Sequence, residues 1–374
     1  MSGKRNDDKK SVVVVGGGGA GSYIARTLSS KLDASKYTLT LVTARPFAVH
    51  YPAAIRLTTT SEGKLEDTVL IPYDKLLLNG NGTIKIDRVV KIEDHKDGGD
   101  LVLASGESLH YDVLILAPGS HWEGPLALPD GKDEILEHIK QWRNKFESAK
   151  GVVLVGGGAV GIEYAGEIRD YWPKKPVTIV QASSQLLNAT YPDKFRKRVE
   201  KDITVRGVKV VYNDFVDNFE PEGPITTRGG KTLEGDLVVI ARGNRPATEF
   251  VSSLGSGVLN ERGQIKVQPT LQLQSHPNIF AAGDAIDWDE QKQVAKYPAH
   301  GDVIIKNVLA VLEKRTSTAQ YKGGPELIIV TNGKNAGVAY LGFLWGIVLG
   351  NWFAKMLKSK TLMVDMVRKS YGYA

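Results

Sequence analysis

Two short glycine-rich segments have the residue spacing of loops that bind the phosphates of a dinucleotide. Residues 16–21 read GGGGAG and residues 156–161 read GGGAVG, so each fits the pattern Gly-x-Gly-x-x-Gly. The first glycine allows a tight turn, the second lets the backbone approach the phosphates, and the third lets a helix pack on a strand. The candidate residues are Gly16, Gly17, Gly18, Gly19, Ala20 and Gly21 in the first segment, and Gly156, Gly158 and Gly161 in the second.

Each glycine-rich segment stands where a strand is expected to pass into a helix, which is the context that the pattern requires. The preceding runs Ser11–Val15 and Val152–Val155 are short and apolar, as buried parallel strands are. Helices are expected after both loops, ending near Leu32 and Tyr171. Second strands are predicted at Tyr37–Thr43 and Val177–Gln181. The repeat therefore predicts two units that each bind one dinucleotide.

The residue that ends the second strand of such a unit usually carries a carboxylate for the ribose hydroxyls. This sequence has Thr43 there in the first unit and Gln181 in the second. At position 181 an acid would repel a 2′-phosphate and an arginine would attract one. Because glutamine does neither, we expect Gln181 to discriminate weakly between NADH and NADPH.

Three further segments repeat the order strand, small residue, glycine. Residues 111–120 read YDVLILAPGS, residues 235–244 read GDLVVIARGN, and residues 278–284 read NIFAAGD. The first of them contains Gly119, and the third ends in Asp284. An aspartate after a glycine is also a common helix N-cap, so Asp284 has a structural alternative to a binding role.

With these motifs the chain resembles the FAD-dependent NAD(P)H oxidoreductases of glutathione-reductase-like fold, and among them the apoptosis-inducing-factor-like branch. The resemblance covers about residues 11–370, and it includes PAAIR at 52–56 and KSK at 358–360. It implies an α/β fold with two doubly wound dinucleotide-binding domains plus a small C-terminal domain. The expected boundaries are 1–125 and 243–325 for the FAD-binding domain, 126–242 for the NAD(P)H-binding domain, and 326–374 for the C-terminal domain.

The resemblance implies FAD as the cofactor and NADH or NADPH as the co-substrate. It places FAD contacts at residues 16–20, Arg56 near the flavin, Val90 near the adenine and Asp284 on the ribityl chain. It also implies two catalytic candidates: Glu163 beside the nicotinamide and flavin, and Lys358 near the active site.

Each of these residues has a simpler reading. Arg56 could be a surface arginine, Val90 a strand core residue and Lys358 a solvated lysine. Glu163 could be an acid in the first turn of a helix, stabilised by the helix dipole.

Two more residues join the cofactor-binding candidates. Gly119 closes Ala-Pro-Gly at 117–119, where the superfamily usually has Ala-Thr-Gly. Lys296 opens the segment KYPAH at 296–300, which follows Asp284 at a distance that suits a helix start directed at the flavin ring. The alternative for Lys296 is an ordinary helix start marked by proline.

The composition excludes several classes of chemistry. The sequence has no cysteine, which rules out a dithiol relay, a cysteine nucleophile and a thiolate metal site. The seven histidines show no metal-binding spacing, so no metal is expected. The net charge of +6 permits anionic cofactors or lipid but selects none, and no basic run with interleaved aromatics indicates nucleic acid.

The segment Asn335–Ala354 has no charged residue, and its length is close to that of a membrane span. The main alternative is a glycine-punctuated strand and a short helix buried against the flavin domain. We favour an intermediate interpretation, in which Trp345, Trp352 and Phe353, followed by several lysines, touch a membrane surface without crossing it. With no secretory signal and no glycine at position 2, we expect an intracellular protein, cytoplasmic or on a membrane surface.

The electron acceptor is approached by exclusion. Without cysteine, disulfide reduction and sulfide oxidation by a cysteine pair are ruled out. A quinone is then the preferred acceptor, and the resemblance implies that it is of the ubiquinone type. Two alternatives stay open: a reductase with a protein electron carrier, and a nucleic-acid-binding or death-signalling flavoprotein whose redox state sets its conformation. The sequence does not indicate an oligomeric state.

Overall fold

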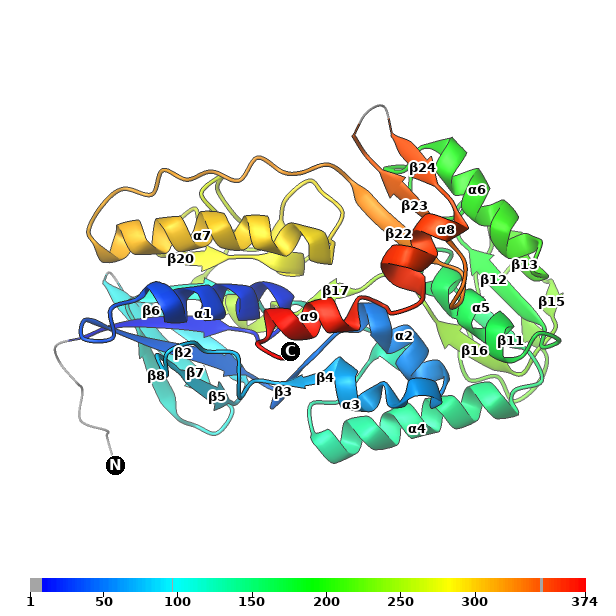
Figure 1. The fold of residues 1–374 in the computed structure, drawn as a ribbon, viewed down its shortest axis with the longest axis horizontal. Coiled ribbons are helices and arrows are strands. Elements are labelled where there is room, and N and C mark those ends of the chain that lie inside the picture. Colours follow the sequence, from blue (N-terminus) through cyan, green and yellow to red (C-terminus); the bar gives the residue numbers. More distant parts are fainter. Residues whose placement is uncertain (1–8, 96, 344–345) are drawn as a thin grey trace.

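The computed structural model describes residues 9–95, 97–343 and 346–374, and its two main sheets lie side by side (Figure 1). The larger sheet has the strand order β19-β20-β9-β1-β2-β5 and is parallel except for the pair β19–β20. Its strands are β1 (Lys10–Val15), β2 (Tyr37–Thr43), β5 (Thr83–Ile86), β9 (Val113–Leu116), β19 (Gln272–Leu273) and β20 (His276–Ala281).

The second sheet is fully parallel and has the order β13-β12-β11-β16. Its strands are β11 (Val152–Val155), β12 (Val177–Gln181), β13 (Val208–Tyr212) and β16 (Leu237–Ile240). These strands fall between β9 and β19 in the chain, so the second unit is inserted into the first. The predicted α/β fold with two doubly wound units is confirmed, whereas the domain boundaries stay a prediction.

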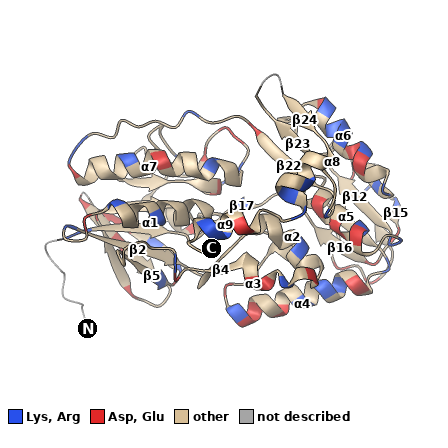
Figure 2. Cartoon of the chain, in the orientation of Figure 1, with Lys and Arg blue, Asp and Glu red and all other residues tan. Residues whose placement is uncertain are grey.

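The helices are α1 (Gly19–Lys31), α2 (Tyr51–Thr59), α3 (Glu66–Val69), α4 (Lys132–Ser148), α5 (Ala159–Tyr171), α6 (Asp193–Thr204), α7 (Tyr297–Leu312), α8 (Asn351–Ala354) and α9 (Val364–Ser370). Of these helices, α1, α5, α6 and α7 pack on strands of the two sheets. Charged residues stand out along α4 and α6 (Figure 2), and α6 buries Phe195, Val199 and Ile203 at helical spacing.

Shorter pairs and a meander complete the fold. The antiparallel meander is β6 (Val89–His95), β7 (Gly98–Leu103) and β8 (Ser108–Tyr111). The small pairs are β3 (Phe47–Val49) with β4 (Leu70–Pro72), β10 (Ser120–His121) with β17 (Arg245–Pro246), β14 (Ile225–Thr226) with β15 (Thr232–Leu233), and β18 (Ile265–Lys266) with β21 (Ile286–Asp287).

The C-terminal block forms an antiparallel sheet of β22 (Leu327–Thr331), β23 (Gly337–Leu341) and β24 (Ile347–Leu349), followed by α8. The uncharged segment 335–354 thus contains strands and a short helix. The sheet packs on α5 and α6 of the second unit, and Val330 and Val338 share a core with Ile162. This corrects the alternative that placed the segment against the flavin domain.

The third glycine of each loop is a packing requirement. A Cβ on Gly161 would collide with the carbonyl oxygen of Gly156, whereas a Cβ on Gly158 would meet nothing within 4 Å. Glycine at position 161 therefore lets α5 approach the end of β11 closely.

We predict that Gly161→Ala destabilises the protein by about 1–3 kcal/mol through this overpacking. The sign of this change in the free energy of unfolding is informative, because alanine at an open helix position stabilises the folded protein by about 1 kcal/mol relative to glycine. Urea unfolding without nucleotide checks the prediction, with Gly158→Ala as the matched control of much smaller effect. Equal stability of the two variants would contradict it.

Candidate active site

The two glycine loops are built alike, each closing the end of its parallel sheet. The N–H of Gly16 donates to Val42 at 2.8 Å, and the N–H of Gly156 donates to Val180 at 2.9 Å. Each loop leads into a helix, α1 or α5, whose N-cap is the second glycine of the motif. Within the described residues, no side chain caps either helix, and neither helix has an acid in its first turn.

These helix starts fit the phosphates of a dinucleotide. The first N–H groups of a helix lack intrahelical partners, and the helix dipole favours an anion near them. The second glycine of each motif, Gly18 or Gly158, has open space where a side chain would project, and so does Gly119. The loops thus combine free donors with room for close approach, as dinucleotide binding requires.

Asp284 lies on the short turn that follows β20, and its carboxylate has three donors. Ser120 Oγ and Asn244 Nδ2 both donate to Oδ2 at 3.0 Å, and the Tyr297 hydroxyl donates to Oδ1 at 2.5 Å. Burial, together with Asp284, raises the pKa of Tyr297, so this hydroxyl stays a donor. The Tyr297 ring also lies against Gly19, which brings Asp284 close to the first loop.

The two catalytic candidates meet in the structure. Lys358 Nζ contacts Glu163 Oε1 at 2.5 Å and donates to the carbonyl of Ile329 at 3.0 Å. The N–H of Thr331 donates to the same carboxylate oxygen at 2.9 Å. Glu163 comes from the second turn of α5, and both side chains are largely buried. The pair therefore joins the second unit to the C-terminal block.

Lys358 reaches this position through an irregular helix. The π-helical turn η6 (Lys355–Ser359) continues α8, and it directs Lys358 inward while Lys355 and Met356 stay exposed. Single π turns within helices are frequent at functional sites.

Arg56 is buried on α2 and is not a surface residue. Its guanidinium makes a two-point ion pair with Glu167, at 2.8 Å for each contact, and it donates to the carbonyl of Ser359 at 2.8 Å. Burial raises the pKa of Glu167 despite the pairing with Arg56. Glu163 and Glu167 lie one turn apart on α5, so their two pairs are neighbours. The expected contact of Arg56 with flavin stays a prediction.

Lys296 belongs to a second buried ionic cluster, next to the turn that carries Asp284. Its Nζ contacts Glu326 Oε1 at 2.5 Å and Glu290 Oε2 at 3.5 Å. The N–H of Gly283 donates to Nδ1 of His300, so Nε2 carries the proton that faces Glu290 at 2.9 Å. Although burial acts to raise it, the donors His300 and Tyr321 keep the pKa of Glu290 below its ordinary value.

Residues 10–308 match the sequence profile of the pyridine nucleotide-disulphide oxidoreductase family. The chain belongs to this family. Its cofactor is therefore FAD, its co-substrate is NAD(P)H, and it is an oxidoreductase. Because the sequence has no cysteine, this member lacks the redox disulfide that the family name describes.

The relatives of this chain include members of the apoptosis-inducing-factor-like branch that the sequence predicted. The chain is 45% identical over 311 residues to the FAD-dependent oxidoreductase FVFD30 of Flammulina velutipes, covering 83% of this chain and 97% of the relative. It is 31% identical to apoptosis-inducing factor homolog B of Dictyostelium discoideum, covering 92% and 93%. Ferroptosis suppressor protein 1 of Taeniopygia guttata is 26% identical over 94% of both chains.

A solved structure has the same fold. The sulfide:quinone oxidoreductase of the hyperthermophilic bacterium Aquifex aeolicus superposes with a TM-score of 0.78 at 18% identity, over 97% of this chain and 92% of that one. In the described part of this family member, every helix is too short or too polar to cross a bilayer.

Other predicted residues lie around the two loops. Gln181 accepts a hydrogen bond from the N–H of Gly157 at 2.8 Å and donates to Ser183 and Gln185, so its amide holds the second glycine loop in place. Val90 is exposed on β6, where its contact with adenine stays a prediction. The partner of Arg56 had no sequence signal, because Glu167 is 111 positions away. In the cluster around Lys296, the partner Glu326 is 30 positions away and had no signal either.

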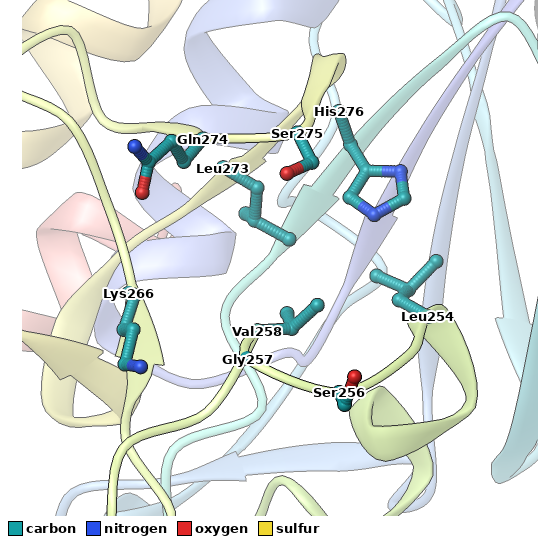
Figure 3. A pocket seen from close by; sticks show the side chains of 9 residues that line it. All are labelled: Leu254, Ser256, Gly257, Val258, Lys266, Leu273, Gln274, Ser275 and His276. Carbon is teal, nitrogen blue, oxygen red and sulfur yellow. The ribbon is translucent and has the colours of Figure 1, made fainter.

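A small pocket of about 200 Å³ lies away from the glycine loops, between residues 254–258 and 273–276 (Figure 3). Ser256, Val258, Leu273 and Ser275 line it, together with His276, which is bonded through Nδ1 to Asp94 at 2.6 Å. None of its lining residues comes from a glycine loop or from the Glu163–Lys358 pair. We therefore assign it no part in the redox site.

The open space at the second glycine gives a test of which loop binds which dinucleotide. We predict that Gly18→Ala weakens FAD binding by roughly tenfold or more, because its methyl group occupies the approach to the phosphates. The ratio of flavin to protein absorbance measures the loss. Gly158→Ala is the matched change in the other loop, and it should keep FAD while raising KM for NAD(P)H. FAD loss from Gly158→Ala alone would reverse the assignment.

Proposed function

We propose that this family member transfers electrons from NAD(P)H to a quinone of the ubiquinone type. When bound, FAD supplies the chemistry of accepting a hydride and passing two electrons onward. The balanced reaction is NAD(P)H, one proton and quinone to NAD(P)⁺ and hydroquinone. A quinone therefore needs protons as well as electrons, and the protein has to deliver them.

The observation that carries the proposal is the buried Glu163–Lys358 pair. An ammonium group has three N–H donors, and the described residues provide Lys358 with two acceptors, Glu163 and the carbonyl of Ile329. The third N–H is available to a ligand oxygen. We infer that Glu163 orients the ammonium of Lys358, which then donates a proton to the quinone.

The chemistry of the chain also favours a quinone. A disulfide acceptor would need a cysteine relay, and the sequence contains none. The Aquifex protein of the same fold is, by name, a quinone oxidoreductase, so the fold is compatible with such an acceptor. A solved relative in fold, putidaredoxin reductase in complex with putidaredoxin, represents the protein-carrier alternative, which the following experiment separates.

Anaerobic stopped-flow mixing tests the proposal in two steps. NADH or NADPH should bleach the flavin band, and a short-chain quinone should then restore it. We predict that Lys358→Met slows the quinone step by roughly 100-fold, as expected on loss of a general acid. Reoxidation by ferricyanide, which takes electrons but no proton, should stay within a few fold of the unaltered protein.

Lys355→Met is the matched control, since Lys355 is exposed on the same turn, and it should leave both steps unchanged. If quinone fails to restore the flavin band in the unaltered protein, the quinone assignment is wrong. If Lys358→Met slows ferricyanide as much as quinone, proton donation is wrong.

We further propose that the C-terminal block contacts a membrane surface, from which a quinone could reach the site. Trp352 is 75% exposed and Met356 53% exposed, one turn apart on the helix that carries Lys358. Lys355 and Lys360 are exposed beside them, as suits an anionic lipid surface. Trp345, the third aromatic of the sequence prediction, lies outside the described residues.

Flotation with anionic vesicles tests this contact. We predict that the protein floats with the vesicles at low salt and that Trp352→Ala with Met356→Ala reduces the bound fraction at least several-fold, because apolar area is lost. Val205→Ala is the control, since Val205 is 78% exposed at the end of α6, outside the C-terminal block. Equal loss from this control would contradict a specific membrane-facing surface.

A further inference from the structure

The carbonyl oxygen of Gly17 is anchored by two side chains. The Tyr73 hydroxyl donates to it at 2.8 Å, and Ser22 Oγ donates to it at 2.9 Å. A trans peptide group is planar, so its C=O and N–H point in opposite directions. Fixing the carbonyl of Gly17 therefore also fixes the direction of the Gly18 N–H, at the start of α1 where the phosphates of FAD are expected.

The side chains that anchor this carbonyl are themselves held by the end of the chain. Tyr371 is 5% exposed, and its ring packs on that of Tyr73 with centroids 6.4 Å apart. Tyr371 also lies beside Ser22: burial raises the pKa of the Tyr371 hydroxyl to about 12, and the Ser22 side chain acts to lower it. Tyr371 thus packs directly on the ring of Tyr73, one of the two groups that bind the Gly17 carbonyl.

Residues of the tail next to Tyr371 also contact the segment that carries Tyr73. Arg368 donates to the carbonyl of Thr68 at 3.3 Å, and its guanidinium lies 4.7 Å from the Tyr373 ring centroid. The Tyr373 hydroxyl bonds to Asp74. Gly372 has a φ of +94° and passes so close to Lys75 that a Cβ would meet the carbonyl oxygen of Lys75 at 2.5 Å. In Figure 1, α9 runs from the C-terminal block back to the first unit and lies near the end of α1.

The NAD(P)H loop is anchored differently at the equivalent position. The carbonyl of Gly157 accepts a hydrogen bond from the backbone N–H of Leu187 at 2.8 Å. That donor belongs to the second unit itself and involves no residue of the tail. The two loops therefore share a geometry. Among the described residues, however, only the FAD loop has an anchor, Tyr73, that packs against the C-terminal tail. The tail also holds the segment before Tyr73, through the contact of Arg368 with Thr68, 300 positions away.

We propose that the C-terminal tail, residues 364–374, is part of the FAD site and that Tyr371 is a positioning residue for the first glycine loop. Tyr371 acts through Tyr73 and Ser22, which hold the peptide between Gly17 and Gly18 in the orientation that receives the phosphates. The inference rests on FAD as the cofactor and does not depend on which acceptor the protein uses.

Flavin release from the purified holoprotein tests the proposal. Tyr371→Ala should raise the FAD dissociation constant roughly tenfold, measured by the recovery of free-flavin fluorescence on dilution. Tyr371→Phe keeps the ring contact with Tyr73 and should stay within about threefold of the unaltered protein. KM for NAD(P)H, measured with FAD in excess, should not change in either variant. An unchanged FAD dissociation constant in Tyr371→Ala would overturn the proposal.

Stability measurements separate positioning from a purely structural role. A ligand that binds only the folded state stabilises it by an amount that grows with the logarithm of its affinity, so a weakened FAD site shows as a smaller gain of stability on FAD addition. Tyr371→Ala should therefore lose more stability in the FAD-loaded form than in the apoprotein. Equal losses in both forms would mean that Tyr371 only supports the fold.

If the tail strengthens FAD binding, bound FAD must in turn stabilise the tail, because coupling between two sites acts in both directions. Resistance of the tail to proteolysis therefore gives a second measurement. Carboxypeptidase should remove Ala374, which is exposed, from either form. Mass spectrometry should then show trimming past Tyr371 at least several-fold faster after FAD is removed. Trimming at the same rate with and without FAD would contradict the coupling.

Discussion

Donors at two helix starts determine what this protein can bind. In α1 and α5 the first N–H groups follow glycine loops, and within the described residues no side chain caps them. Such ends have unpaired N–H donors and a dipole that favours an anion, so they are suited to bind phosphate groups. The rest of the fold serves this requirement: parallel strands bring both loops to sheet ends, and Gly21 and Gly161 let the helices approach closely.

The buried face of α5 is where the parts of the chain are joined by charge. Glu163 and Glu167 lie one turn apart and meet Lys358 from the C-terminal block and Arg56 from α2. Burying a carboxylate is costly unless it is paired, so each glutamate requires its partner to be in place. The two cationic residues, Arg56 and Lys358, come from opposite ends of the sequence. The formation of both ion pairs thus depends on the complete fold, and removing one partner leaves an unpaired buried charge.

The sequence predicted features that depend on local patterns, and it failed where contacts are distant. The glycine loops, β1, β2, β11 and β12 follow from short apolar runs before glycine, and the structure confirms them. Asp284 was found by its motif, but its donors Ser120, Asn244 and Tyr297 come from three other segments. The pairing of Arg56 with Glu167 had no local signal, since 111 positions separate them. The uncharged C-terminal run was ambiguous because glycines interrupt an apolar stretch that suits strand, helix or membrane.

The helix that carries Lys358 connects the proposed proton donor with the proposed membrane-facing surface. In a regular α-helix residues three positions apart lie on the same face, so Lys355 and Lys358 would tend to share their exposure. The π turn η6 changes this phase, and Lys358 points to the carboxylate of Glu163 while Met356 and Trp352 stay at the surface. One short segment therefore presents apolar side chains outward and a proton donor inward.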